Sequence, residues 1–149
     1  MMVYCSIEPA VPEDAPAIAA LLRSENLPAG DFAEHLAHFL VGRSGDEVVA
    51  AVGAEIYGDD ALLRSLVVAP TWRDGGVGGE MLRQLEARAE QWGVRRWWLL
   101  TTTAEAFFTN RGFRVTARSK VPAAIAATGE FRELCPATAV CLSRERRTE

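Results

Sequence analysis

Hydrophobic and polar positions change their period along the chain, and these changes mark the expected elements. Residues 62–68 form a branched apolar run that ends before Pro70, which predicts a strand because proline cannot continue a sheet ladder. Val77, Met81 and Leu85 then recur at every fourth residue, which is the period of one helix face. A glycine-rich turn separates the two patterns. The sequence therefore predicts a strand, a glycine-rich turn and a helix in direct succession.

The rest of the chain shows weaker versions of the same two periods. Apolar alternation and short apolar runs predict further strands at residues 3–10, 39–43, 47–57, 95–100, 113–119 and 138–143. Helices are expected to begin at residues 12–16, at Asp31 and at Thr103, where residues that favour helix initiation occur. Residues 121–136 are expected to form a short helix and a loop. The strand–helix–strand order over residues 62–100 indicates a parallel pair with a right-handed crossover.

Composition restricts the class of protein. A chain of 149 residues, 49% hydrophobic and 24% charged, suits a single globular domain over residues 1–149. The net charge of −4 argues against a nucleic-acid partner, which requires a basic face. Because no apolar run could span a membrane and the N-terminal residues show no basic segment followed by an apolar one, we expect a cytoplasmic protein without a membrane partner. The three cysteines have no zinc spacing, so no metal is expected.

The glycine-rich turn has the chemistry of an anion site. Glycines allow a ligand to approach the backbone closely, and a helix N-terminus offers N–H groups and a favourable dipole to a phosphate. The turn matches neither the P-loop nor the dinucleotide fingerprint. Its pattern, Arg73-x-x-Gly76-x-Gly78, resembles the signature of the GCN5-related N-acetyltransferases (GNATs). An ordinary strand–turn–helix connection with chance glycines is the alternative.

The resemblance to the GNATs covers essentially the whole chain. It implies an α/β (α+β) fold with a mixed central sheet of about six or seven strands, splayed between its two central parallel strands, and about four helices. It also implies an N-acetyltransferase that uses acetyl-CoA as cosubstrate. Residues 107–113, FFTNRGF, resemble the family's usual helix ending. Dimers are common in the family, which leaves a homodimer open.

A closer resemblance rests on several short runs. Residues 99–108, LLTTTAEAFF, are similar to a segment of short bacterial N-acetylglutamate synthases. Together with residues 63–68, 121–125, 130–131 and 134–140, they resemble the arsenic-resistance branch of the GNATs. This resemblance implies a role in arsenic resistance, with a small amino-acid-like amine as acceptor.

The resemblance also assigns roles to residues of the cofactor site. The pyrophosphate would be held by main-chain amides of Arg73, Asp74, Gly75, Gly76, Val77, Gly78 and Gly79. Main-chain groups of Leu66, Val67 and Val68 would pair with the pantetheine arm as an added strand would. Phe108 and Asn110 would line the thioester end. Many GNATs have a tyrosine acid where this chain has Phe108, and phenylalanine cannot donate a proton. The acid is therefore unassigned.

Candidates for catalysis and acceptor binding come from the residues themselves. Glu55 is a candidate base, with an ordinary solvent-facing strand residue as the alternative. Arg64 interrupts an apolar strand, which suggests a bidentate grip on an acceptor carboxylate; a surface ion pair is the alternative. Ser65, Thr101 and Thr102 would add hydroxyl groups. Further candidates are Glu105 and Glu130 as bases, His35 and His38 near the acceptor, and Arg118 and Lys120 for anions.

The two C-terminal cysteines allow two interpretations. Cys135 and Cys141 could bind a trivalent arsenical, since soft thiolates favour soft metalloids. Cys141 falls in an expected strand, however, where a free cysteine is most often a small buried hydrophobic residue, and we favour that interpretation.

The sequence leaves three functions open. The first is acetylation of an amino-acid-like amine in arsenic resistance. The second is acetylation of an ordinary amino acid such as glutamate in metabolism. The third is an acyl-CoA-binding module that performs no chemistry, for which Phe108 is the main support.

Overall fold

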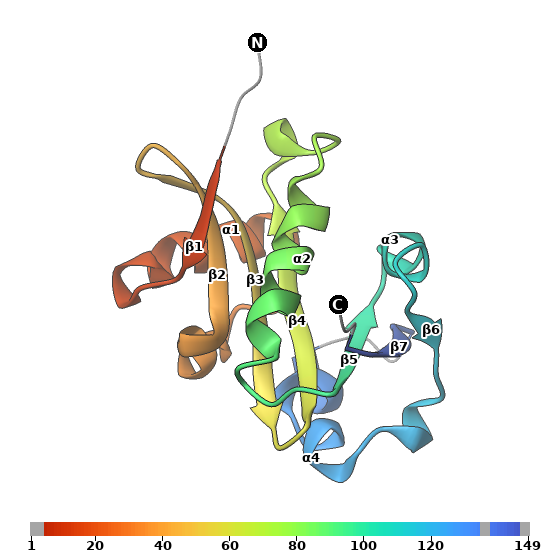
Figure 1. Cartoon of the computed structure of the whole chain (residues 1–149). Coiled ribbons are helices and arrows are strands. Elements are labelled where there is room, and N and C mark those ends of the chain that lie inside the picture. The colour runs from red at the N-terminus through yellow and green to blue at the C-terminus, as the bar shows by residue number, and fades with distance from the viewer. Residues whose placement is uncertain (1–4, 135–137, 147–149) are drawn as a thin grey trace. The chain divides into compact units, whose positions relative to one another are not determined.

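The structure, a computed structural model, describes residues 5–134 and 138–146. Within these residues seven strands form one mixed sheet in the order β1-β2-β3-β4-β5-β7-β6, as Figure 1 labels them. The strands are β1 (Ser6–Pro9), β2 (Phe39–Ser44), β3 (Glu47–Tyr57), β4 (Asp60–Val68), β5 (Arg96–Thr101), β6 (Arg114–Val115) and β7 (Val140–Glu145).

Four α-helices and five helical segments of other types complete the described part of the chain. The α-helices are α1 (Ala15–Ser24), α2 (Val77–Ala89), α3 (Glu105–Thr109) and α4 (Ala123–Ala126). The 3₁₀ segments are η1 (Pro12–Asp14), η2 (Phe32–His38), η3 (Pro70–Trp72) and η4 (Arg118–Lys120), and η5 (Glu130–Leu134) is a π-helix. An α/β fold with a mixed seven-stranded sheet is therefore confirmed.

The chain divides into two compact units, which we describe separately. The first unit comprises Met1–Ala54 and Ser65–Arg88, and the second comprises Glu55–Arg64 and Ala89–Glu149. Strands β3 and β4 each contribute residues to both units. The first unit contains the glycine-rich turn, whereas the second contains Glu55, Arg64 and α3.

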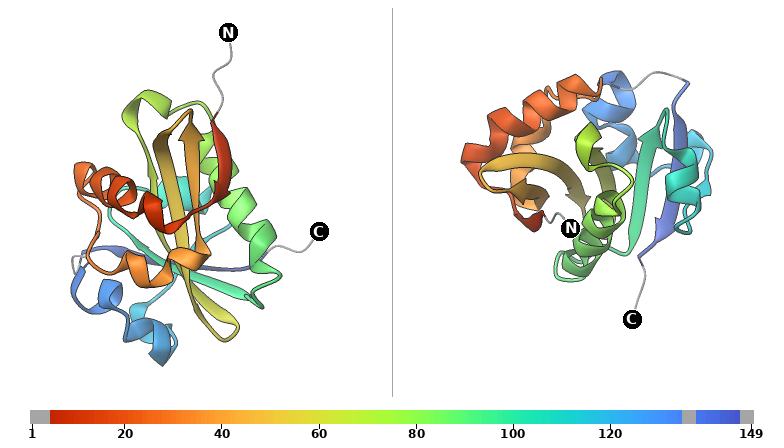
Figure 2. Two further views of the ribbon diagram at one scale, coloured as in Figure 1. Left: turned by 90° about the vertical axis from the view of Figure 1, so that its left-hand side faces the viewer. Right: turned by 90° about the horizontal axis from the view of Figure 1, so that it is seen from above.

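The first unit has three layers. Strands β1, β2 and β3 pair antiparallel, and Figure 2 shows α1 on one face of these strands and α2 on the other. On the α1 face, a core cluster joins Ile18 and Leu22 to residues of the strands. Each of these two aliphatic side chains stabilises the fold by about 1.5–3 kcal/mol through burial. On the α2 face, a Cβ at Gly42 would lie 3.7 Å from Met81 Sδ, so the helix approaches the strand closely.

One glycine of this sheet is required by packing. Gly53 pairs with Phe39 across β2 and β3, and a Cβ at Gly53 would lie only 2.2 Å from the Phe39 ring. The ring therefore occupies the space of the absent side chain. This close approach explains a glycine in a strand interior, where it would otherwise weaken the strand.

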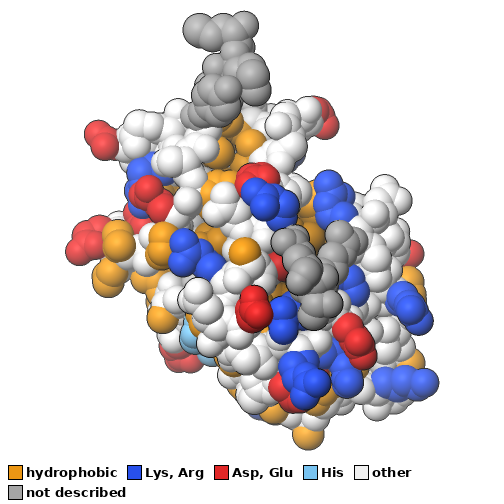
Figure 3. Space-filling model, in the orientation of Figure 1, with side chains coloured by type: hydrophobic (Ala, Val, Ile, Leu, Met, Phe, Trp, Pro, Cys, Tyr) orange, Lys and Arg blue, Asp and Glu red, His pale blue; other side chains and the backbone are white. Residues whose placement is uncertain are grey.

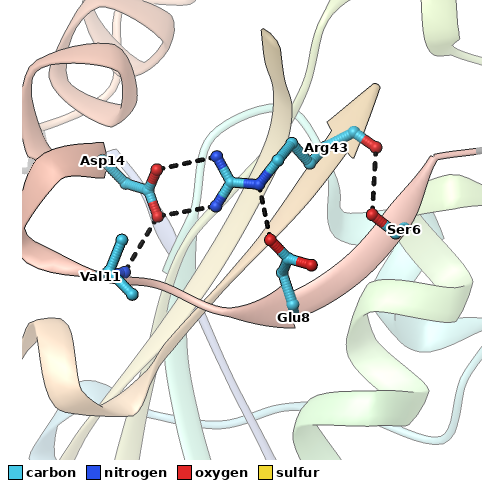
Figure 4. A network of polar contacts seen from close by, with 5 residues as sticks. All are labelled: Ser6, Glu8, Val11, Asp14 and Arg43. Atoms are coloured by element: carbon cyan, nitrogen blue, oxygen red, sulfur yellow. Dashed lines mark hydrogen bonds and ion pairs between the residues drawn. The ribbon is translucent and has the colours of Figure 1, made fainter. Parts of the chain in front are cut away.

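A charged network ties the N-terminal segment to the sheet (Figure 4). Arg43 of β2 donates to Glu8 of β1 at 2.6 Å and makes two bonds of 3.0 Å to the carboxylate of Asp14. Asp14 also accepts the Val11 N–H at 2.9 Å. These hydrogen bonds, with that of Arg43 first among the causes, hold the pKa of Asp14 below its ordinary value. The network therefore fixes β1 and the entry to α1 on β2.

The second unit is organised on β5. Strand β4 is parallel to β5 with Asp60 opposite Arg96, and β7 is antiparallel to β5 along the whole length of β5. A core cluster beside these strands contains Leu62, Trp98, Val121, Ile125 and Cys141. Residues 121–125 thus cover the strands with α4, which explains why this irregular segment is apolar.

Several predicted boundaries need correction. The strand expected at 113–119 is shorter: β6 ends at Val115, and the chain then turns into η4. The helix expected from Asp31 is the 3₁₀ helix η2, and residues 121–134 hold α4 and a π-helix rather than one helix and a loop. Thr103 does not cap α3. The N-cap is Ala104, whose N–H is accepted at 2.9 Å by the Thr101 hydroxyl.

Candidate active site

The end of β4 changes its side-chain alternation at Ser65. Ser65 has a φ of 62°, an uncommon left-handed conformation for a residue that is not glycine. Leu63 and Arg64, which precede it, are both buried, whereas burial alternates after it. Val67 enters the core of the first unit, while Leu66 and Val68 are half-buried on the other face. The strand segment predicted to hold pantetheine is therefore anchored through Val67.

The glycine-rich turn leads from β4 into α2 through η3. Asp74 and Gly76 have φ values of 67° and 84°, so the turn twice takes the left-handed conformation. Neither the backbone conformation nor the packing at position 75 requires a glycine. Gly75 is not among the described residues with positive φ, and a Cβ there would meet only Trp72 O at 3.9 Å, an ordinary contact. A glycine that neither backbone conformation nor packing demands fits close approach by a ligand.

The turn ends at the N-terminus of α2. The first bond of this helix region runs from the Glu80 N–H to Gly76 O at 3.1 Å. The amides of Val77, Gly78 and Gly79 belong to the first turn, whose N–H groups have no carbonyl partner within a helix. The predicted pyrophosphate amides thus come from one left-handed turn and one helix N-terminus, an arrangement that suits an anion.

The Arg73 side chain connects the glycine-rich turn to the end of β4 and to α1. Its Nε donates to Val68 O at 3.0 Å, and its terminal nitrogen NH2 donates to the carboxylate of Glu25. Glu25 is the C-cap residue of α1. Arg73 therefore links the predicted phosphate turn to the central strand and to the first helix, all within the first unit.

Charge is distributed unevenly between the two units. The first unit has five Lys or Arg residues against eleven Asp or Glu, a formal charge of −6, whereas the second has eleven against nine, a formal charge of +2. On the face drawn in Figure 3, Lys and Arg side chains gather over β6 and the segment that follows it. The glycine-rich turn lies in the acidic unit. An anion bound at the turn would therefore depend on local donors rather than on the field of the unit.

A buried polar cluster forms the second group of predicted residues. Arg64 NH1 lies 2.6 Å from Glu55 Oε2, and Arg64 Nε lies 3.8 Å from Glu130 Oε1. The other Glu55 oxygen accepts the Tyr57 hydroxyl. Arg64, Glu55 and Glu130 are 2%, 2% and 4% exposed. The structure thus brings the candidate base and the candidate carboxylate-binding arginine together as an internal ion pair.

The aromatic end of α3 forms a compact group. Phe108 is buried, and its ring lies edge-on to Phe107 and Phe113 at centroid distances of 5.1 and 5.3 Å. Asn110 is the exposed C-cap of α3, and Thr102 is exposed between β5 and α3. Phe108 therefore has a packing role whether or not it also lines a cofactor.

The other candidates lie on η2, α3 and η4. His35 and His38 lie on η2, and burial, with a smaller effect of His35, lowers the pKa of His38. Glu105 is exposed at the start of α3, and Arg118 donates to Ala139 O at 3.2 Å. Lys120 is exposed at the end of η4.

Cys141 belongs to the apolar core of the second unit, and this burial raises the pKa of its thiol. The interpretation of Cys141 as a buried hydrophobic residue is confirmed, whereas Cys135 lies outside the described residues. Among the residues that the structure describes, no cluster of His, Cys, Asp or Glu could hold a metal ion. No described helix has both the length and the apolar character that a membrane span requires.

Two residues of these groups escaped the sequence analysis. Tyr57 lies two positions after Glu55 on one strand, and this spacing places both side chains on the same face. Period-2 spacing could therefore have identified Tyr57. Glu25 is 48 residues from Arg73, and nothing in the local pattern of either residue indicates their contact.

A sheet with a parallel central pair and a glycine-rich turn at a helix N-terminus defines an α/β domain suited to a phosphate-bearing ligand. Residues 7–113 match the acetyltransferase (GNAT) family, and the chain belongs to that family. An amino-acid acetyltransferase of Azotobacter vinelandii (strain DJ / ATCC BAA-1303) is 37% identical over 94 residues, which cover 62% of this chain and 22% of that protein. The chain therefore spans about a fifth of the length of that relative.

Solved structures show the same fold. N-acetylglutamate synthase from Neisseria gonorrhoeae, complexed with coenzyme A and N-acetyl-glutamate, superposes with a TM-score of 0.83 at 21% identity. The match covers 99% of this chain and 36% of that one. Rv2747 from Mycobacterium tuberculosis, solved in complex with CoA, gives a TM-score of 0.78 at 21% identity, covering 94% of this chain and 98% of that one. The names of the Azotobacter and Neisseria relatives refer to acetylation of amino acids, and these comparisons give the arsenic-resistance branch no support.

Proposed function

We propose that this chain is an acetyl-CoA-dependent N-acetyltransferase whose acceptor is the amino group of a small amino acid. The observation that carries the proposal is the glycine-rich turn at the N-terminus of α2, where Gly75 is glycine without a demand from backbone or packing. Membership of the GNAT family supports the donor. The amino-acid acetyltransferases among its relatives support the class of acceptor.

The turn would bind the cofactor through its backbone. Amide N–H groups of residues 73–79 would donate to the diphosphate oxygens, and the glycine at position 75 leaves room for these oxygens. Arg73 would add a charged donor at the entrance of the turn. Bound acetyl-CoA would supply the acetyl group as a thioester. Leu66 and Val68 would present main-chain groups to the pantetheine arm, with Val67 as their anchor in the core.

Acetyl transfer also requires a group that takes a proton from the acceptor amine. The acceptor must be a neutral amine to attack, and it loses a proton as the new amide forms. Glu55 remains the candidate base, and its contact with Tyr57 makes the Glu55–Tyr57 pair a candidate relay. Since Glu55 is only 2% exposed, the pair can act only if the acceptor or a bridging water reaches this cluster. Phe108 cannot supply the acid, so the thiolate would leave without a tyrosine donor.

The proposed class of acceptor is supported by the relatives more than by the surroundings of Arg64. Arg64 faces Glu55 and Glu130 of the chain itself, so an acceptor carboxylate would have to compete with internal ion pairs. Direct binding of an acceptor carboxylate by Arg64, with hydroxyl groups supplied by Ser65, Thr101 and Thr102, stays a prediction. Glutamate is the first acceptor to test, because an N-acetylglutamate synthase shares the fold. The arsenic-containing amino acid implied by the short sequence runs is the second, and a cytoplasmic location stays a prediction for either.

Release of free CoA from acetyl-CoA tests the proposal directly. The full chain is incubated with glutamate, with other common amino acids and with an arsenic-containing glutamate analogue. Turnover on glutamate or another common amino acid would support the metabolic function, and turnover confined to the arsenical would support detoxification. Binding of acetyl-CoA without turnover on any acceptor would instead favour the third function, a CoA-binding module. A chain that binds no CoA would overturn the proposal.

A further inference from the structure

Arg73 has two partners that belong to different parts of the first unit. Its Nε donates to Val68 O at 3.0 Å, which holds the side chain along the end of β4. Its NH2 donates to Glu25 at the C-cap of α1. The Arg73 side chain is 45% exposed and that of Glu25 is 25% exposed, so both remain within reach of a ligand in solution.

Hydrogen bonds at the C-terminal end of α1 fix the backbone of Glu25. The Glu25 N–H donates to Leu22 O at 3.1 Å, and Asn26 follows with a φ of 59°. The Leu27 N–H also returns to Leu22 O, at 2.9 Å. This left-handed helix ending fixes the backbone on both sides of Glu25. The carboxylate is therefore presented to Arg73 by a defined turn and not by a flexible loop.

We propose that Glu25 is a positioning residue that competes with the diphosphate of the cofactor for Arg73 and thereby promotes the release of CoA. This inference rests on the proposed function, because it takes the glycine-rich turn as the diphosphate site. Without CoA, Glu25 neutralises Arg73. When CoA binds, the diphosphate and Glu25 are two anions that share one guanidinium, and Glu25 recovers Arg73 as CoA leaves.

Two effects of removing the Glu25 charge oppose each other, and their sizes decide the sign. Loss of the ion pair would loosen Arg73, but a partly exposed pair contributes little to order. Loss of the carboxylate would also remove a fixed negative charge from the guanidinium that receives the diphosphate, in a unit whose formal charge is already −6. The second effect is the larger one. Removing the charge should therefore tighten CoA binding and slow its release.

The test measures the dissociation constant and the dissociation rate constant of free CoA for the full chain and its variants. Glu25→Gln keeps the shape and removes the charge, and Glu34→Gln is the matched control on an exposed part of η2 in the same unit. We expect Glu25→Gln to lower both constants about three- to tenfold, whereas Glu34→Gln leaves them within about 1.5-fold of the wild type. Thermal unfolding of each variant verifies that it folds.

A double-variant cycle assigns the effect to Arg73. Arg73→Gln should weaken CoA binding, and adding Glu25→Gln to it should change the dissociation constant by less than about 1.5-fold. Equal or weaker CoA binding by Glu25→Gln would overturn the inference, and so would tightening that persists without Arg73. If the wild type binds no CoA, the proposed function itself fails. If the wild type binds CoA and Glu25→Gln behaves as the wild type does, only the inference fails.

Discussion

Arg64 NH1 lies 2.6 Å from Glu55 Oε2 inside the second unit, where both side chains are almost inaccessible to solvent. This ion pair explains why an arginine can lie within an apolar strand. The sequence suggested either a grip on an acceptor or a surface ion pair, and the structure shows a buried pair that neither alternative described. Removing a charge from water is costly, so each member of the pair depends on the other.

Stability should therefore respond strongly to loss of Arg64. Arg64→Ala leaves Glu55 buried without this guanidinium, and we expect the free energy of unfolding to fall by about 3–5 kcal/mol. Urea denaturation at pH 7 measures the change. Arg95→Ala, which removes an exposed arginine from the same unit, is the control and should cost less than about 0.5 kcal/mol. Equal effects of the two substitutions would contradict a buried ion pair at Arg64.

The Asp14–Arg43 pair predicts a pH dependence of stability. Hydrogen bonds from Arg43 hold the pKa of folded Asp14 below its ordinary value of about 3.9. A lowered folded pKa means that the ionised pair stabilises the protein above the pKa of the unfolded chain. This contribution disappears as the pH falls through the lower pKa of the folded state. The Asp14–Arg43 pair therefore adds to the free energy of unfolding at neutral pH, and this contribution is lost in acid.

The Asp14→Asn variant measures this contribution to the free energy of unfolding. At pH 7 we expect the variant to lose about 1.5–3 kcal/mol of unfolding free energy, since the lost bonds join charged groups. The difference from the wild type should stay constant above about pH 5 and shrink below about pH 4. Glu13→Gln, an exposed acidic residue of the same turn, serves as control. A difference that is the same at every pH would show that Asp14 acts through its shape and not through its charge.

The reactivity of Cys141 should follow its burial. The thiol lies in the apolar core of the second unit, and burial raises its pKa, so little reactive thiolate forms at pH 7. In a variant with Cys5→Ser and Cys135→Ser, Cys141 should react with a thiol reagent at least about tenfold more slowly when folded than in urea. Rapid reaction of the folded variant would contradict burial and would reopen thiol binding of an arsenical.

The predictability of the fold varied with the length of the sequence pattern. The strand expected at residues 62–68 is β4 (Asp60–Val68), and the helix expected after the glycine-rich turn is α2 (Val77–Ala89). Both were predicted because the first carries a largely apolar run and the second a clear helical period. The strand expected at 113–119 failed because its ladder ends early: the Thr116 N–H still reaches Cys141 O at 2.8 Å, but the next residues turn into η4. A run of apolar and polar residues does not show where its partner strand stops.

In the candidate site, too, local sequence patterns were predictable and long-range contacts were not. The glycine-rich turn was predicted because its residues are contiguous and their chemistry is local. The contacts of Arg64 with Glu130 and of Arg73 with Glu25 were not predicted, because each joins residues that only the folded chain brings together. Glu130 and Glu25 are ordinary glutamates in their own segments. Tertiary contact alone gives them a particular partner.

Gly75 offers the sharpest test of the cofactor turn, because its substitution should not strain the protein. Gly75→Ala adds a Cβ whose nearest described neighbour, Trp72 O, is 3.9 Å away, and position 75 has no positive φ. We expect thermal stability to be unchanged and CoA binding to weaken at least about tenfold, because the methyl group would occupy space needed by the diphosphate. Calorimetry with free CoA measures the affinity.

Two controls separate lost space from altered backbone. Gly30→Ala adds a methyl group in open space elsewhere in the first unit and should change neither stability nor affinity. Gly76→Ala acts differently: position 76 has a φ of 84°, so the substitution should lower stability by about 1 kcal/mol and weaken binding as well. If Gly75→Ala bound CoA as the wild type does, the diphosphate could not pass close to residue 75. The turn would then have to bind its ligand through the amides of α2 alone.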